Sequence, residues 1–188
     1  RHQAKAYVVL NGFLHDKDFA GLGEFVEFLD SVGTDAVIVS DLGVVTLVRE
    51  CAPQLPIHLS TQASCLNRYA ANLWQAAGVK RVILGREVSV KEAGIIKRST
   101  GLEIEMFIHG SLCMSYSGHC TISNYTSGRD SNRGGCAQSC RFEYTLEHKE
   151  WGGKTGFFMS SKDLQGISLL PEFIKQEIDS VKIEGRMK

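Results

Sequence analysis

The chain has 188 residues, 43% of them hydrophobic, which is enough to bury the core of one domain. Its 21 basic and 21 acidic side chains give a formal net charge of zero, which excludes an overall attraction to nucleic acid or to an anionic membrane. No apolar run approaches the roughly 20 residues of a membrane-spanning helix, and the first residues lack the pattern of a secretion signal. We expect a globular cytoplasmic protein with no membrane contact, in which any RNA contact is local.

Apolar, β-branched runs alternate with helical patterns along the chain. The runs predict strands at residues 6–11, 35–41, 56–61, 81–86, 104–110, 157–161 and 180–185. The intervening patterns predict helices at residues 19–33, 42–52, 64–78, 89–101 and 163–176. Gly33, Gly78 and Gly101 close three of these helices, because glycine adopts a left-handed C-terminal conformation most easily. Helices that return to buried strands indicate a parallel sheet.

This rhythm predicts an α/β fold of the (β/α)-barrel (TIM-barrel-like) type. A complete barrel needs roughly 250 residues, and residues 110–141 are cysteine-rich rather than βα in pattern. We therefore expect residues 1–188 to form an incomplete barrel domain with a cysteine-rich loop at 110–141 inserted within it. We also expect the chain to be an internal fragment.

Polar side chains follow nearly every predicted strand. In parallel βα folds the active site lies at the carboxyl ends of the strands, so these residues are candidates for a site. Four polar residues, by contrast, stand where a predicted helix begins and are expected to be N-caps: Asp41, Ser64, Ser89 and Asp163. The remaining candidates are Asn11, Ser40, His58, Ser60, Thr61, Gln62, Arg86, Glu87, Glu105, His109, Ser160, Ser161, Lys162, Lys182, Glu184 and Arg186.

Two pairs of these candidates differ by an even number of residues. Glu105 and His109 are expected on one face of their strand, where a carboxylate and an imidazole inside a barrel need partners or a chemical role. Lys182 and Glu184 are also expected to share a face. They could form a structural ion pair or belong to the site, and the sequence favours neither reading.

Four cysteines, Cys113, Cys120, Cys136 and Cys140, lie in one stretch rich in Gly, Ser and Asn. Their thiolates suit zinc or an iron–sulfur cluster. Six, fifteen and three residues separate them, and only the last pair has the short spacing of a zinc knuckle. The spacing therefore favours an iron–sulfur cluster over zinc. We interpret Cys51 and Cys65, in helix-like sequence, as core residues.

Two other classes remain open. One is a peptidase. The HExxH motif of metalloproteases and the GxSxG motif of serine hydrolases do not occur in the sequence. A thiol peptidase that uses Cys113 and His109 is compatible with it. A non-enzymatic protein in which a structural metal site stiffens the long loop is the other alternative. It does not explain the polar residues at the strand ends.

The stretch EMFIHGSLCMSYSGHCTISNYTSGRDSNRGGCAQSCRFEY, with HLSTQAS and GVKRVILGRE before it and SVKIEGRMK after it, closely resembles peptidase family U32, the collagenase-like peptidases. The resemblance covers essentially the whole chain. It implies either proteolysis, as the family name says, or hydroxylation of tRNA, ribosomal RNA or the ubiquinone precursor without molecular oxygen and with a four-iron four-sulfur cluster. The ubiquinone branch resembles this chain less well, because its cysteines are distributed differently. In the similar tRNA branch the product is 5-hydroxyuridine at the wobble position and prephenate is required.

Carried onto this chain, the resemblance implies a set of site residues and partners. The implied partners are RNA, above all tRNA, a small anionic metabolite such as prephenate, and a partner subunit. The implied cluster ligands are Cys113, Cys120, Cys136 and Cys140, with zinc as the alternative metal. The expected catalytic residues are Glu105, His109, Arg86 and Glu87. The expected substrate-binding residues are His58, Gln62, Lys182, Glu184 and Arg186.

Overall fold

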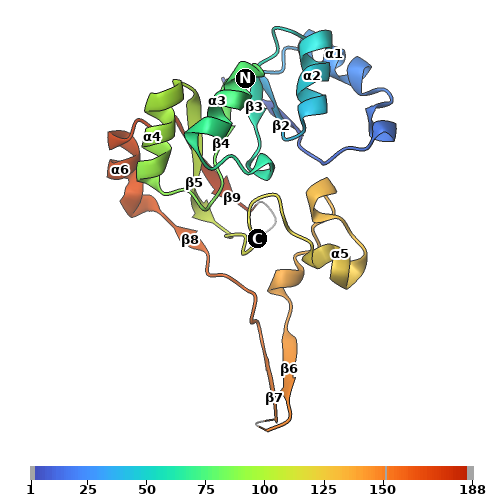
Figure 1. The fold of residues 1–188 in the computed structure, drawn as a ribbon, viewed down its shortest axis with the longest axis vertical. Coiled ribbons are helices and arrows are strands. Elements are labelled where there is room, and N and C mark those ends of the chain that lie inside the picture. The colour runs from blue at the N-terminus through green and yellow to red at the C-terminus, as the bar shows by residue number, and fades with distance from the viewer. Residues whose placement is uncertain (1–2, 151, 186–188) are drawn as a thin grey trace.

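A computed structural model describes residues 3–150 and 152–185 of the chain. Six parallel strands form the main sheet (Figure 1). In spatial order they are β1 (Tyr7–Leu10), β2 (Ala36–Val39), β3 (Ile57–Leu59), β4 (Arg81–Ile83), β5 (Glu103–Gly110) and β9 (Ser180–Glu184). A short strand, β8 (Leu164–Gln165), pairs antiparallel with the carboxyl end of β5. The parallel sheet predicted from the βα rhythm is confirmed.

Helices connect the strands and lie against one face of the sheet. They are α1 (Leu22–Ser31), α2 (Leu42–Cys51), α3 (Arg68–Ala76), α4 (Val90–Thr100) and α6 (Leu170–Lys175). Short 3-10 turns cover Asp16–Phe19, Thr61–Ala63, Ser131–Arg133, Ser139–Arg141 and Ile167–Leu169. In Figure 1, α1 and α2 stand beside the first strands, and α3, α4 and α6 stand beside the later ones.

The two faces of the sheet differ in chemistry because successive side chains of a strand point to opposite sides. The face under the helices is apolar and forms the core with Val37, Val39, Ile57, Leu59, Val82, Leu84, Ile104 and Met106. The opposite face carries His58, Arg81, Glu105 and Lys182, which are aligned by the strand register. The helix-covered face thus stabilises the fold and the other face is free for polar groups.

Local capping fixes several helix ends as the sequence predicts. Asp41 accepts a hydrogen bond from the Gly43 N–H at 2.6 Å, and Ser89 forms a reciprocal capping box with Glu92. Gly101 ends α4 in a left-handed conformation at φ 70°. Two cap predictions are wrong.

Ser64 closes the Thr61–Ala63 turn, and it is Asn67 that caps α3, by accepting from the N–H groups of Tyr69 and Ala70. Asp163 precedes β8 rather than a helix, because the predicted helix at 163–176 is shortened to α6 and the turn before it. Glycine at position 166 approaches the Ile108 carbonyl closely and keeps this segment against β5.

The strand predicted at 157–161 is wrong. Phe157 and Phe158 are 60% and 41% exposed, and the segment pairs with no other strand in the described chain. Instead the chain forms an unpredicted antiparallel ribbon, β6 (Tyr144–His148) with β7 (Gly152–Gly156), which projects from the body in Figure 1. The other strands are predicted because strand and helix patterns alternate along the chain. A two-stranded ribbon has no helix between its strands and gives no such signal.

Barrel closure is not confirmed. Over residues 3–150 and 152–185, β1 and β9 lie at the two ends of the strand order and do not pair with each other. In the same residues, no helix combines the length and apolar character needed to cross a bilayer.

Replacing Ile104 by Ala should lower the free energy of unfolding by about 2–5 kcal/mol, because Ile104 is fully buried in the core. Chemical denaturation measures this loss. Leu73 is an apolar control that is 67% exposed on α3, and Leu73→Ala should change stability by less than about 0.5 kcal/mol. Equal losses in the two variants would contradict the assignment of this face as the core.

Candidate functional site

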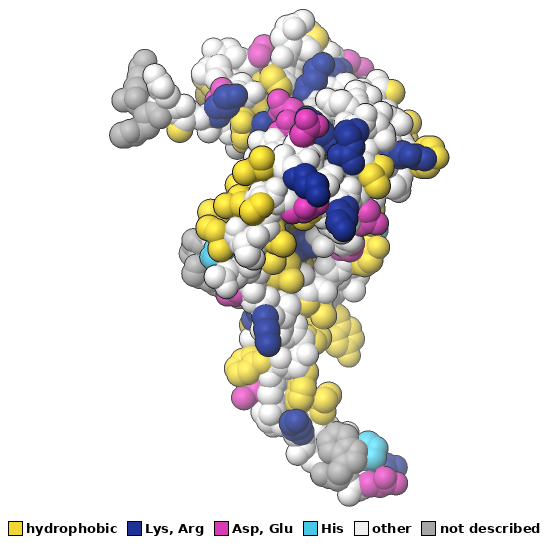
Figure 2. Space-filling model, turned by 90° about the vertical axis from the view of Figure 1, so that its left-hand side faces the viewer, with side chains coloured by type: hydrophobic (Ala, Val, Ile, Leu, Met, Phe, Trp, Pro, Cys, Tyr) yellow, Lys and Arg dark blue, Asp and Glu magenta, His cyan; other side chains and the backbone are white. Residues whose placement is uncertain are grey.

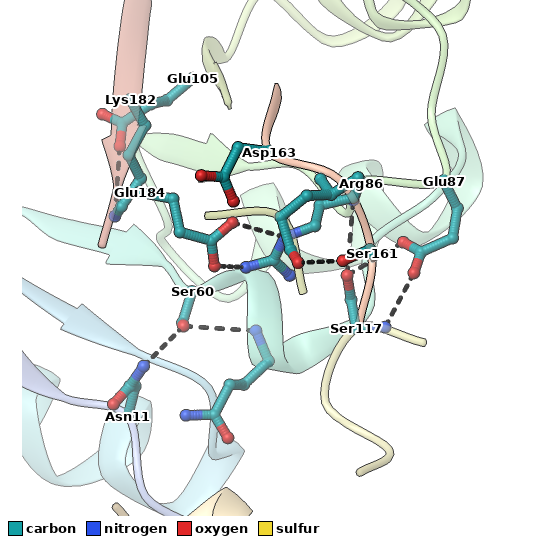
Figure 3. Close-up of polar contacts among 12 residues, drawn as sticks. Asn11, Ser60, Arg86, Glu87, Glu105, Ser117, Ser161, Asp163, Lys182 and Glu184 are labelled. Atoms are coloured by element: carbon teal, nitrogen blue, oxygen red, sulfur yellow. Dashed lines mark hydrogen bonds and ion pairs between the residues drawn. The ribbon is translucent and has the colours of Figure 1, made fainter. Parts of the chain in front are cut away.

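The cysteine-rich segment folds over the carboxyl ends of the strands and is anchored there through Ser117. The Glu87 carboxylate accepts hydrogen bonds from the Ser117 N–H at 2.8 Å and from its hydroxyl at 3.0 Å. The Arg86 N–H donates to the Ser117 hydroxyl oxygen at 3.4 Å (Figure 3). Ser117 is 2% exposed. This anchor joins the segment to the loop that follows β4.

Gly118 makes the next contact. It has φ +79°, and a Cβ atom at this position would lie 2.0 Å from the Gln62 carbonyl oxygen. Only glycine permits this backbone conformation without strain and this approach without a clash. The loop after β3 and the cysteine-rich segment are therefore in direct backbone contact.

Two arginines secure the rest of the segment. Arg133 forms an ion pair with Asp18 at 2.9 Å and donates to the Phe13 carbonyl oxygen, both in the region after β1. Arg141 donates to the Leu112 carbonyl oxygen at 2.8 Å and to the Ser160 hydroxyl at 2.9 Å. Arg133 thus ties the middle of the segment to the region after β1, and Arg141 joins the two ends of the segment, which includes the short helix α5 (Ile122–Ser127).

All four cysteines of the segment line one cavity of about 300 Å³. A second cavity of about 680 Å³ adjoins it and shares three of these cysteines, Cys113, Cys136 and Cys140. Other residues distinguish the two cavities. The smaller one includes Gln62, Arg86, Tyr116 and Ser117, the larger includes Phe107, Arg141 and Lys182, and Glu184 lines both.

The thiols influence one another. Burial raises the pKa of Cys140, and negative charge on Cys113, Cys136 and Cys120 adds to this effect, while Arg141 opposes it. Burial also acts to raise the pKa of Cys120, but hydrogen bonds from surrounding hydroxyl and backbone groups outweigh it and hold that pKa below its usual value. Gathered thiolates repel, so a bound cation would stabilise the arrangement.

The four cysteines of the cavity form a donor set made of thiols. All six cysteines are free thiols, and the four that line the cavity are the ligand type that iron–sulfur clusters take. In the described part of the chain, no three His, Cys, Asp or Glu side chains are grouped closely enough to hold one metal ion.

Arg86 and Glu184 form a two-pronged ion pair (Figure 3). Both line the smaller cavity together with the thiols. The Arg86 Nε lies 2.9 Å from Glu184 Oε2, and the guanidinium group lies over the Phe107 ring at 4.4 Å. Both partners are largely buried, with side-chain exposures of 16% and 21%. This pairing neutralises Arg86, so its charge is not available to an anion while the pair is intact.

Lys182 and Glu184 share a face of β9, as predicted, but the ion pair considered between them is wrong. Lys182 lies 3.4 Å from Glu105 Oε1, whereas Glu184 pairs with Arg86. Glu105 also accepts from Arg81 at 3.3 Å and from the Ser180 hydroxyl at 3.0 Å. The Glu105 carboxylate is thus fully engaged in a network that joins β4, β5 and β9.

The expectation that Glu105 and His109 share a face is also wrong. The pairing of β5 with β9 shifts by one residue between Phe107 and His109, which places His109 opposite Ile183. Glu105 is 7% exposed, while His109 is exposed and Ile183 is 71% exposed. A β-bulge reverses the side-chain alternation, so His109 points away from the polar face.

His58 lies inside the sheet rather than in a cavity. It is 5% exposed and meets the Tyr7 ring edge to face at a centroid distance of 4.8 Å. Burial, assisted by the positive charge of Arg81, lowers the pKa of His58 to about 4. The imidazole is therefore neutral near pH 7 and cannot contribute positive charge to substrate binding.

The chain resembles known proteins over its full length. All of residues 1–188 match the sequence model of peptidase family U32. The chain belongs to peptidase family U32. A solved structure of a U32 peptidase has a TM-score of 0.61 with this chain at 12% identity and shares its fold across 98% of this chain and 70% of that one.

Three curated relatives of this U32 chain carry names that refer to RNA. It is 41% identical over its whole length to tRNA hydroxylation protein P1 of Bacillus subtilis (strain 168), of which it covers 46%. It is 36% identical to tRNA hydroxylation protein P of Escherichia coli (strain K12), with 98% of the chain and 51% of the relative covered. The 23S rRNA 5-hydroxycytidine C2501 synthase of the same strain is also 36% identical, with coverages of 100% and 29%. The chain thus spans about half the length of the tRNA hydroxylation proteins.

Within the U32 chain, the structure divides the predicted site residues into two groups. Gln62, Arg86, Lys182, Glu184 and the four cysteines line the two cavities. His58, Glu87, Glu105 and His109 do not line either cavity, and Arg186 lies outside the described residues. The roles predicted for these residues stay predictions.

Sequence reasoning missed three contributors to the site: Tyr116 at the smaller cavity, Ser117 as the anchor and Arg141 as the clamp. The SYSG run supplied a signal, since a small hydroxyl residue followed by glycine is typical of a tight backbone contact.

Replacing Gly118 by Ala should loosen the cysteine-rich segment from the strands, because the new methyl group would meet the Gln62 carbonyl oxygen. We expect a loss of about 1–3 kcal/mol beyond that of a matched control. Gly128→Ala provides the control, since Gly128 also has positive φ but no atom within 4 Å of its would-be Cβ. Hydrogen exchange of residues 113–141 and thermal unfolding measure the difference, and identical behaviour of the two variants would contradict this docking.

Stability should decrease as the pH falls from about 6.5 to about 4, in part through His58. The folded protein keeps this imidazole neutral until pH is about 4, whereas the unfolded chain protonates it near pH 6.5. The unfolded state therefore binds more protons in this window, which lowers the free energy of unfolding. Denaturation of the wild type and of His58→Phe at several pH values measures the contribution, and the variant should show the shallower slope.

Proposed function

We propose that the protein hydroxylates RNA and that Cys113, Cys120, Cys136 and Cys140 hold a four-iron four-sulfur cluster. One observation carries this proposal: the four thiols line a single cavity at the carboxyl ends of the strands, together with Arg86, Gln62 and Glu184. The position is the one where parallel βα folds place their active sites. The names of the RNA-hydroxylating relatives support the reaction class.

The cluster would supply one-electron chemistry, which amino-acid side chains lack. The protein residues perform the other tasks. The Ser117 anchor and the Arg141 clamp fix the thiols relative to the strand ends. Arg86 stacks on Phe107 and pairs with Glu184, which makes this part of the cavity wall rigid. Glu184 lines both cavities. Such a wall keeps a bound substrate in one orientation.

The finer proposal is 5-hydroxylation of the wobble uridine of tRNA with prephenate as a required metabolite. Lys182 and Arg141 line the larger cavity, where a small anion of this kind would compete with their present partners, Glu105 and Asp163. Since the net charge of the chain is zero, RNA contact must be local. Three exposed aromatic rings offer surfaces for stacking bases: Tyr116 and Tyr125 in the cysteine-rich segment, and Phe142 directly after it.

The proposal also extends to the setting of the domain. A polar face on one side of the sheet and a helix-covered apolar face on the other match the inside and outside of a (β/α)-barrel, so we propose that the sheet is part of one. Cytoplasmic localisation and a partner subunit belong to the same proposal.

The peptidase alternative receives less support from the geometry. A thiol peptidase needs a base beside its nucleophile. In the described residues, no hydrogen bond joins His109 to Cys113, and His109 does not line either cavity with that thiol. Cluster binding would also occupy the sulfur.

Changing Cys136 to Ala should abolish both the visible absorption of the anaerobically purified protein and the hydroxylated nucleoside in its RNA substrate, because a cluster ligand is lost. Absorption spectroscopy and nucleoside mass spectrometry measure the two effects. Cys51→Ala is the matched control, since Cys51 packs against the core and lines neither cavity, and it should retain both properties.

A colourless protein that binds one zinc ion would contradict the cluster. Peptide hydrolysis that persists at the full rate in Cys136→Ala, with no RNA modification by the wild type, would favour the peptidase alternative instead.

A further inference from the structure

Gln62 carries an amide without a partner at the edge of the smaller cavity. The carbonyl oxygen of its side chain is buried and makes no hydrogen bond, although the residue lines the cavity. The backbone of Gln62 is well fixed, because its N–H donates to the Ser60 hydroxyl at 3.3 Å and its carbonyl oxygen contacts Gly118. A buried polar group without a partner is costly, so this amide is suited to a ligand that supplies one.

Tyr116 lies at the rim of the same cavity. Its side chain is 56% exposed, so much of the ring faces solvent while the residue still lines the cavity. The adjacent Ser117 is buried and bound to Glu87, which fixes the backbone from which the ring projects. The His119 ring lies 6.3 Å away at a tilt of 48°. An exposed ring on a fixed backbone loses little entropy when a flat ligand stacks on it.

We propose that Gln62 and Tyr116 form a subsite for a single unpaired pyrimidine base beside the four thiols. This inference rests on the proposed function and names the part of the RNA that enters the site. Tyr116 stacks on the base, and the Gln62 amide hydrogen-bonds its polar edge. Both are positioning and specificity residues.

The smaller cavity suits an uncharged ligand because its charged side chains are already paired. Among the described residues, Arg86 is the cation that lines this cavity, and Glu184 already pairs with it. An uncharged flat ring with donors and acceptors on its edge therefore suits the cavity better than a phosphate does. An amide can present either its oxygen or its nitrogen after a half-turn, so it can accept from or donate to a pyrimidine edge. A cluster held by the four thiols would fill part of this cavity of about 300 Å³, so the base would lie at its rim, beside Tyr116.

The test compares the binding of two short single-stranded RNAs to the purified protein. One carries a uridine at its centre, and the other has an abasic residue there. The wild type should bind the uridine RNA roughly 10-fold or more tightly than the abasic one, a ratio typical of a stacked and hydrogen-bonded base. Tyr116→Ala and Gln62→Leu should each reduce this ratio toward one, while Tyr116→Phe should retain it. Tyr125→Ala is the matched control, because Tyr125 is 91% exposed on α5 but does not line the cavity.

Visible absorption of each variant shows whether the thiol site is intact, and it should match the wild type. A ratio unchanged in both Tyr116→Ala and Gln62→Leu would overturn the subsite, as would a ratio near one in the wild type. Hydroxylation is measured separately by nucleoside mass spectrometry. If the wild type shows the expected ratio but makes no hydroxylated base, the proposed reaction fails while the subsite stands.

Discussion

The contact between the cysteine-rich segment and the strand ends is the interaction on which the site depends. Two hydrogen bonds from Ser117 to the Glu87 carboxylate and the close approach of Gly118 to the Gln62 carbonyl oxygen hold the segment in place. A long segment rich in Gly and Ser is otherwise costly to order, because each fixed residue loses conformational entropy. These few contacts offset the loss of conformational entropy, and they fix the positions of the thiols in the segment. Glu87, expected to be catalytic, is seen here as the acceptor that makes this docking stable.

Charge pairing determines what the polar face can do. Glu105 is held by Arg81, Lys182 and Ser180, and Arg86 is held by Glu184. A partly buried ion that loses its partner is destabilising, so these side chains remain paired in the absence of a competing ligand. The network that joins β4, β5 and β9 reaches the larger cavity through Lys182, and the Arg86–Glu184 pair forms another part of the cavity wall. The Glu105 network and the Arg86–Glu184 pair both contain residue types that are common in active sites. The two groups differ in the partners that their side chains bind.

The sequence predicted the elements whose signals are local and periodic. Strands such as β2 and β3, and the ends of α2 and α4 at Asp41, Ser89 and Gly101, follow from side-chain pattern and capping chemistry. The errors arise from events that periodicity does not encode. The bulge before His109 depends on the partner strand β9, more than 70 residues later, and the pairing of Arg86 with Glu184 spans 98 residues. Likewise, the ribbon of β6 and β7 replaces a strand predicted from two phenylalanines that prove to be exposed.

The arrangement of the two cavities constrains any chemistry at the thiols. Cys113, Cys136 and Cys140 line both cavities, so a group held by these sulfurs has access to each. The smaller cavity offers an aromatic ring and an amide, whereas the larger offers Lys182 and Arg141. A neutral flat ligand and a small anion therefore find different surroundings and do not compete for the same space. Glu184 lines both cavities and its charge is balanced by that of Arg86, so the boundary between the cavities is close to neutral and the cations nearest to an anion are Lys182 and Arg141 of the larger cavity.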